Sequence, residues 1–176
     1  LTGPAVSESL WSELDLVTVD PFVEGAISVA ETARRKRIPV VSIEIEPGDP
    51  LASLSDTVIN SAGFLRRHDA GGPAEIARAL IDQGIETVIV TRGSDGADAY
   101  GVGGPWHQPV YPVPAVDTTG AGDGFRAGYI AGSLTGFDLA GRVRLATAVA
   151  ALSVCHVGGC GGNVGREEAL ELAGLA

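Results

Sequence analysis

A glycine-rich segment at residues 117–125 carries the residue types best suited to chemistry, in the order Asp-Thr-Thr-Gly-Ala-Gly-Asp-Gly-Phe. Glycine has no Cβ, so a phosphate can approach such a backbone closely, and unpaired N–H groups at a helix start point toward it. These donors can stabilise the charge that builds on phosphoryl oxygens during transfer. The carboxylate of Asp123 can accept the proton of an attacking hydroxyl. The alternative is a glycine-rich turn in which Asp123 only caps the following helix.

Short apolar runs alternate with helical patterns along the chain, and these elements must position the glycine-rich segment. Strands are expected at residues 14–19, 40–45, 57–59, 87–91, 97–100 and 107–111. Helices are expected at residues 23–33, 73–84, 123–134, 139–154 and 166–172. The buried face of the first helix should consist of Val23, Ile27, Ala30 and Ala33, and that of the second of Ile76, Ala77, Leu80 and Ile81.

The alternation of strands and helices with short connections predicts an α/β fold, a three-layer sandwich around a mainly parallel sheet. The strand at residues 87–91 is apolar on both faces, which is typical of a buried parallel strand. Ligands of such sheets bind at the carboxyl ends of the strands, here Asn60–Ser61, Thr91–Gly96 and Asp117–Asp123. No repeat or linker interrupts the sequence, so residues 1–176 are expected to form a single domain.

The composition excludes several classes of function. Acidic residues outnumber basic ones 22 to 12, and the net charge of -10 disfavours nucleic acid and anionic lipid as partners. No stretch approaches the roughly 18 apolar residues of a membrane span. Two cysteines make no disulfide framework, so a cytoplasmic location is expected. Cys155, His156 and Cys160 lack a fourth ligand at a recognised zinc-site spacing.

Two common nucleotide-binding motifs are also missing or out of place. The chain has no Gly-x-x-x-x-Gly-Lys-Ser/Thr segment, which disfavours a P-loop nucleotidase. The glycines of 101–104 precede Pro105 and Trp106 rather than a helix, which excludes a dinucleotide-binding fingerprint.

The segment Asp117–Asp123, with its continuation to Gly128, resembles the C-terminal signature of the ribokinase (pfkB) family of carbohydrate kinases. The resemblance extends over nearly the whole chain and implies a ribokinase-like fold. It implies that Gly120, Ala121 and Gly122 form an anion hole. It also implies that Asp123 deprotonates a sugar hydroxyl, which then attacks the γ-phosphate of ATP.

The same resemblance implies a set of residues around the nucleotide and its ions. Those expected to contact or border ATP are Ser61, Thr91, Gly93, Gly96, Thr147 and Gly158. Magnesium is expected to accompany ATP, and a potassium-like ion would be held near Asp117, Thr119, Ser153, His156, Gly158 and Gly162. The turn Asp95–Gly96 is equally compatible with a simple hairpin.

The chain departs from the family pattern in two ways. Many relatives have an Asn-x-x-Glu motif, whereas here Gly63 stands at the fourth position of the motif that begins at Asn60. In this respect, and in residues 41–46, the chain resembles ketohexokinase-like members. Nothing in Leu1–Asp20 matches the family's sugar-binding N-terminal half and lid, and the chain contains no methionine. We therefore expect part of a longer protein, or one half of a split one.

The sequence thus predicts an ATP-dependent kinase acting on a sugar or related small alcohol. The alternative is a non-catalytic nucleotide-binding fragment or pseudokinase that needs a separate sugar-binding half. Association through a lid into a homo-oligomer stays open as well.

Overall fold

The computed structural model describes residues 6–68, 71–159 and 162–176. The chain divides into two compact units. The first unit consists of Leu1–Val90 with Tyr100–Gly104, and the second of Thr91–Ala99 with Pro105–Ala176. The expectation of a single domain stays a prediction. Among the described residues, no helix has the length and apolarity that crossing a bilayer requires.

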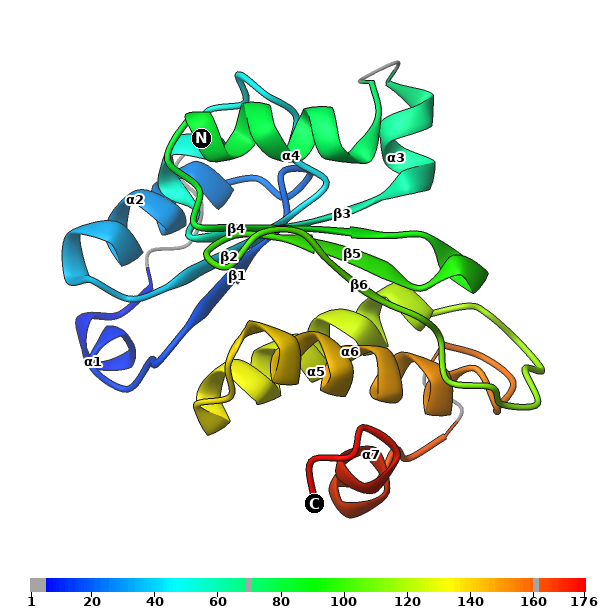
Figure 1. Cartoon of the computed structure of the whole chain (residues 1–176). Helices are drawn as coiled ribbons and strands as arrows, with labels where there is room; N and C mark the ends of the chain where they lie inside the picture. Colours follow the sequence, from blue (N-terminus) through cyan, green and yellow to red (C-terminus); the bar gives the residue numbers. More distant parts are fainter. Residues whose placement is uncertain (1–5, 69–70, 160–161) are drawn as a thin grey trace. The chain divides into compact units, whose positions relative to one another are not determined.

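The strands form one sheet in the order β1-β2-β3-β4-β5-β6 (Figure 1). Their bounds are Val17–Val19, Val40–Ile43, Thr57–Ser61, Thr87–Thr91, Ala97–Tyr100 and Trp106–Gln108. β1 pairs with β2 and β2 with β3 in parallel, whereas β5 and β6 form an antiparallel hairpin. The predicted α/β fold with a mainly parallel sheet is thereby confirmed.

The first unit packs its helices on β1 to β4 around an apolar core. These helices are α1 (Glu8–Trp11), α2 (Ala26–Lys36), α3 (Ala62–Arg67) and α4 (Pro73–Asp82), with a 3-10 turn, η1, at Ala52–Leu54. The largest fully buried apolar side chains include Ile45, Leu51, Leu80, Ile85 and Ile89. The short helices α1 and α3 were not predicted, because segments of four and six residues are too short to show a helical period.

The predicted buried face of α2 was partly wrong. Val23 and Ile27 are 61% and 44% exposed, while the buried positions are Ala26, Ala30 and Ala33. Gly25, in the left-handed conformation with φ 88°, precedes the helix, so Val23 lies outside it. The stripe that faces β1 and β2 is therefore made of alanines at spacings of four and three.

The buried face of α4 largely agrees with the prediction. Ile76, Ala77 and Leu80 are buried, and Ile81 is 36% exposed at its margin. Pro73 occupies the first turn, where its missing N–H removes no helical hydrogen bond. Strand β1 begins at Val17 rather than residue 14, and β6 covers Trp106–Gln108 rather than 107–111.

The second unit contains the β5–β6 hairpin, a 3-10 turn, η2, at Gly93–Asp95, and three helices. They are α5 (Ala121–Thr135), α6 (Leu139–Ser153) and α7 (Arg166–Leu172). α5 and α6 form a helical hairpin and lie side by side (Figure 1). Gly136, with φ 84°, ends α5, and the Asp138 carboxylate caps α6 by accepting the Gly141 N–H at 2.8 Å.

Glycines let the main chains of α5 and α6 approach each other closely. A Cβ at Gly128 would stand 2.7 Å from the Cα of Ala146, and one at Gly132 would stand 3.0 Å from the Cα of Arg142. A Cβ at Gly124, one turn earlier, would stand 3.0 Å from Oγ of Ser153. Glycine every fourth residue therefore fixes how α5 lies on α6, and with it the position of the glycine-rich turn that starts α5.

Candidate active site

The glycine-rich segment forms the start of α5 in the second unit. Gly120 is the residue before the helix, in the left-handed conformation with φ 78°. The N–H of Ala121 donates to the carbonyl of Thr118 at 3.2 Å, so this amide of the predicted anion hole is already engaged. The N–H groups of Gly120 and Gly122 donate no hydrogen bond to any described residue. Two of the three predicted amides thus remain available to an anion.

Two of the glycines in this turn differ in how much space surrounds them. A Cβ at Gly120 would stand 2.7 Å from both the Cα and the carbonyl oxygen of Gly159, so only glycine fits there. A Cβ at Gly122 would meet nothing within 4 Å. The space on the Cβ side of Gly122 is therefore open.

Asp117 ties the segment to the loop that follows α6. Its Oδ1 accepts the N–H of Thr119 at 2.9 Å, and its Oδ2 accepts the N–H of Gly158 at 2.8 Å. These hydrogen bonds, first that from Thr119 and then that from Gly158, hold the pKa of Asp117 below its ordinary value of 3.8. The N–H groups of Val116 and Asp117 both donate to the carbonyl of Val154, at 2.7 and 3.1 Å. The loop geometry therefore depends on an ionised Asp117.

Asp123 stands in the first turn of α5 with its side chain 76% exposed. Its Oδ1 lies 3.0 Å from Nη2 of Arg126, one turn further along the helix. An ionised carboxylate in the first turn also interacts favourably with the helix dipole. The predicted base is thus accessible, and its carboxylate is oriented by one arginine.

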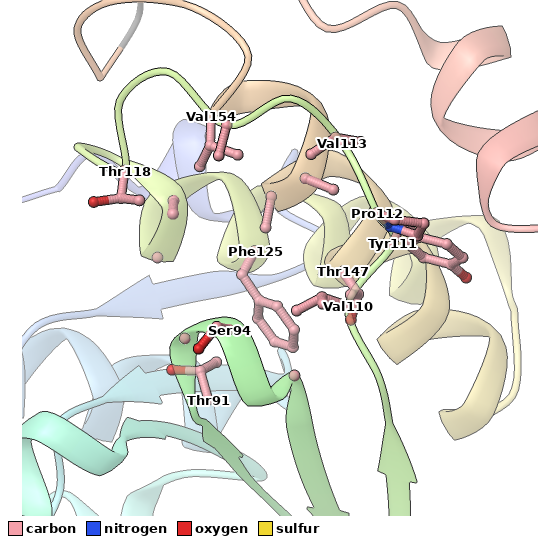
Figure 2. A pocket seen from close by; sticks show the side chains of 17 residues that line it. Thr91, Ser94, Val110, Tyr111, Pro112, Val113, Thr118, Phe125, Thr147 and Val154 are labelled. Atoms are coloured by element: carbon pink, nitrogen blue, oxygen red, sulfur yellow. The ribbon is translucent and has the colours of Figure 1, made fainter.

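A cavity of about 400 Å³ lies in the second unit beside this helix start. Its lining comes from the segments 91–96, 110–115, 118–125 and 147–154 (Figure 2). Thr118 lies at one side of it, and the ring of Phe125 projects toward its middle (Figure 2). Ala121 and Gly122, which follow Thr118 in the chain, also belong to the lining. Elsewhere its walls are mostly apolar. An elongated ligand with an anionic end at the α5 turn and an apolar body fits this arrangement.

The strand ends of the first unit form a separate polar cluster. Ser61 caps α3 by accepting the Phe64 N–H at 3.0 Å, and its own N–H donates to Oε1 of Glu44 at 2.9 Å. Glu44 has φ 52°, and its Oε2 is buried without a hydrogen-bond partner among the described residues. Burial raises the pKa of Glu44 above its ordinary 4.5, against the opposing effect of the Ser61 hydrogen bonds. Ser61 and Glu44 thus have a local structural role.

Comparison with known proteins finds similarity over more than half of the chain, including the glycine-rich turn of the second unit. A family model described as pfkB family carbohydrate kinase matches residues 61–164. The chain belongs to the pfkB family. This confirms the resemblance drawn from residues 117–128.

Individual pfkB relatives agree with this assignment. Ribokinase of Bacillus subtilis (strain 168) is 45% identical over 167 residues, covering 91% of this chain and 55% of that protein. Fructoselysine 6-kinase of Escherichia coli (strain K12) is 38% identical over 81 residues, covering 46% of this chain and 31% of that protein. The alignments thus span about half, or less, of these relatives' length.

A solved pfkB relative shares the fold. Arabidopsis thaliana ribokinase, complexed with ribose and ATP, superposes with a TM-score of 0.83 at 23% identity. The match covers 98% of this chain and 61% of that protein. At this identity the likeness shows the ribokinase-like fold alone.

Some of the residues predicted from the pfkB resemblance line the cavity of the second unit, and others do not belong to its lining. Thr91, Gly93, Gly96 and Thr147 line the cavity together with Ala121 and Gly122. Gly120 and Asp123 flank these residues in the same turn without lining the cavity. Gly158 does not line the cavity either, and its N–H donates to Oδ2 of Asp117. Ser61 belongs to the first unit.

The predicted ion ligands have other partners in this pfkB chain. Both oxygens of Asp117 accept backbone N–H groups, and the Ser153 hydroxyl donates to the Ala150 carbonyl at 2.8 Å. Among the described residues, no three His, Cys, Asp or Glu side chains gather as a metal cluster would. Ser153, His156, Gly158 and Gly162 would act mostly through backbone oxygens, which these side-chain contacts do not test. A potassium-like ion beside them and Asp117 and Thr119 stays a prediction. Cys160 lies outside the described residues.

Sequence reasoning missed most of the cavity wall. The segment 110–115 lines the cavity without belonging to a helix or strand, so it has no periodicity to reveal it. The α6 wall did carry a signal. Thr147, Ala150, Ala151 and Val154 recur at i, i+3, i+4 and i+7, which places them on one helix face.

Proposed function

We propose that this chain forms the nucleotide-binding and catalytic part of an ATP-dependent kinase that phosphorylates a hydroxyl of a sugar or related small alcohol. The observation that carries the proposal is a cavity lined by Gly122, whose N–H donates to no described residue, next to the exposed carboxylate of Asp123. An anion site and a base adjoin an apolar cavity. The names of its relatives, ribokinase and fructoselysine 6-kinase, favour a sugar as acceptor.

The residues present fit a nucleotide. The apolar walls suit a base, and the start of α5 suits phosphate oxygens. ATP would supply the phosphoryl group, with magnesium neutralising part of its charge. Gly120 and Gly122 would donate their N–H groups to oxygens on which negative charge grows. Asp123 would accept the proton of the acceptor hydroxyl, while Arg126 holds that carboxylate in place.

A second candidate is a nucleotide-binding fragment that needs another polypeptide for catalysis. The 76% exposure of the Asp123 side chain favours it for the isolated chain. Transfer to a hydroxyl rather than to water requires that water be excluded from the site. The activity of the whole protein, its acceptor and its oligomeric state are therefore parts of the proposal.

The test combines binding and transfer. ADP–magnesium is titrated into the chain by calorimetry, and transfer from ATP to a sugar panel is assayed with the chain alone and with any sugar-binding half encoded upstream. Transfer in either sample supports the kinase. Binding without transfer in both samples supports the fragment, and no ADP binding overturns both.

A further inference from the structure

Most side chains that wall the second unit's cavity cannot form hydrogen bonds. Val110, Pro112 and Val113 come from the segment after β6, Phe125 from α5, and Val154 directly follows α6 (Figure 2). Ala150, on α6, belongs to the lining too. None of the described residues that line the cavity carries a charge, an imidazole or a side-chain amide. Asn, Gln and Asp side chains, which read base edges with fixed donors and acceptors, are thus missing from this wall.

The polar side chains of the lining are hydroxyls only, those of Thr91, Ser94, Tyr111, Thr118 and Thr147. A hydroxyl can donate or accept a hydrogen bond, so none of them presents a fixed donor or acceptor to a base edge. Thr118 adjoins Ala121 and Gly122 at the end proposed for phosphate. The hydroxyl of Tyr111 points away from the cavity, with its ring at the rim (Figure 2). Neither position suits recognition of a base edge.

Thr147 is the hydroxyl on the α6 wall itself. Its Oγ1 donates to the carbonyl of Val143 at 2.9 Å. A hydroxyl can also accept a hydrogen bond, and it can rotate to donate instead. Thr147 can therefore accept from the amino group of adenine or donate to the carbonyl oxygen of guanine, and it does not exclude either base.

We infer that this cavity takes purine nucleotides without strong selection at the 6-position of the base, so that GTP and ATP both serve as phosphoryl donors. The inference deepens the proposed function and rests on it. Sites built to hydrogen-bond a ligand reject an analogue lacking that group by about 10⁴-fold or more, whereas apolar pockets discriminate by only about 10–200-fold. Bicyclic bases are favoured over monocyclic ones because they bury more apolar surface.

Calorimetry with the magnesium complexes of ADP, GDP, IDP and UDP tests this inference. The expected ratio of the ADP and GDP dissociation constants is below about a hundred, with IDP in the same range and UDP the weakest of the four. An ADP preference above about a hundredfold over GDP overturns the inference while leaving the proposed function intact. If no nucleotide binds, the proposed function fails first, so the two failures are distinguishable.

Two variants test which side chains determine nucleotide affinity and base selectivity. Thr147→Val, which keeps the side-chain shape, should weaken ADP and GDP by the same factor; a change in their ratio of about tenfold or more would show that Thr147 reads the base and would overturn the inference. Ala150→Leu, which fills the wall, should weaken both nucleotides together. Its control is Ala140→Leu, on the same helix but outside the cavity lining, which should bind both as the parent chain does.

Discussion

Nη2 of Arg126 lies 3.0 Å from Oδ1 of Asp123, one turn apart on the solvent side of α5. Exposed ion pairs of this kind contribute little to folding, typically about 0.2–1 kcal/mol. The relationship therefore concerns the carboxylate itself more than the stability of the helix. Arg126 restricts the orientation of the Asp123 carboxylate, the proposed base.

Replacing Arg126 should separate catalysis from stability. Arg126→Gln is expected to lower kcat by about tenfold, because the carboxylate loses its orienting charge, with a smaller change in the KM for ATP. Arg126→Lys should retain most of the rate, since a cation still reaches Asp123. Steady-state kinetics and thermal melting measure both effects. Equal losses in the two variants, or a lowered melting midpoint, would contradict a positioning role.

Asp123→Asn removes the proposed base while keeping the size of the side chain. The rate of phosphoryl transfer should fall by about a hundredfold or more, with ADP affinity little changed, because the N–H of Gly122 and the cavity are untouched. The exposed Asp95→Asn serves as a control and should transfer at the parent rate. A parent-like rate in Asp123→Asn would show that another group takes the proton.

Asp117 gives the loop before α5 a defined pH dependence. Its pKa in the folded chain is below the ordinary 3.8, so its hydrogen bonds to Thr119 and Gly158 are fully present above pH 3.8 and are lost as pH falls through the lower folded value. The amide proton resonances of Thr119 and Gly158 should move together with a midpoint below 3.8. A midpoint at or above 3.8 would contradict this.

Asp117→Asn removes one of these two hydrogen bonds at neutral pH. One amide loses its acceptor, because the Asn side chain has only one oxygen, and ADP affinity should fall by about tenfold. Asp138→Asn is the matched control, since Asn caps α6 as well as Asp does. Unchanged affinity in Asp117→Asn would mean that the loop is held by its other contacts.

Glu44 should make the chain less stable as it ionises. Its pKa is raised, so the folded state keeps the proton to higher pH than the unfolded state, and stability is lost as pH rises from about 4.5 through the folded value. Glu44→Gln, which preserves the acceptor for the Ser61 N–H, should be more stable than the parent at pH 7. Its advantage should shrink below pH 4.5.

Urea unfolding of the parent and of Glu44→Gln at several pH values measures this difference. Glu31→Gln, at an exposed position on α2, provides the baseline for removing a charge. A constant difference between Glu44→Gln and the parent across the pH range would refute the assignment of the effect to Glu44 ionisation.

The glycine contacts between α5 and α6 predict a large steric effect. Gly128→Val should destabilise the chain by about 1–3 kcal/mol, because its Cβ would stand 2.7 Å from the Cα of Ala146. Ala131→Val, at an exposed position of the same helix, adds a β-branched residue without that clash and should cost less than about 1 kcal/mol. Chemical denaturation compares the two. Similar losses would mean that α6 can move aside.

The sequence predicted best those features that are local. The helix at residues 166–172 and the strand at 87–91 have the predicted bounds, because their apolar pattern or high β-propensity decides them within a few residues. The turn at Gly120 was found because glycine and a following carboxylate are adjacent in the chain. Val23 was misplaced because Gly25 sets the helix start, and a periodic pattern continues across that point.

Features that join distant segments could not be predicted. Asp117 accepts a hydrogen bond from the N–H of Gly158, 41 residues away in the chain. Neither residue type predicts that the two will meet. The Ala121 N–H was expected to be available, yet its hydrogen bond to Thr118 follows from the dihedral angles of the turn. The cavity wall at 110–115 depends on where an irregular segment runs, which tertiary packing decides.

The glycine spacing along α5 has a consequence for how this chain could diversify. α5 supplies the turn that would meet phosphate, α6 supplies the wall that would meet the base, and their main chains touch at Gly128 and Gly132. The distance between the turn proposed for phosphate and the wall proposed for the base is therefore set by the main-chain contacts between α5 and α6. Substitutions along the wall can alter which base is accepted without changing that distance.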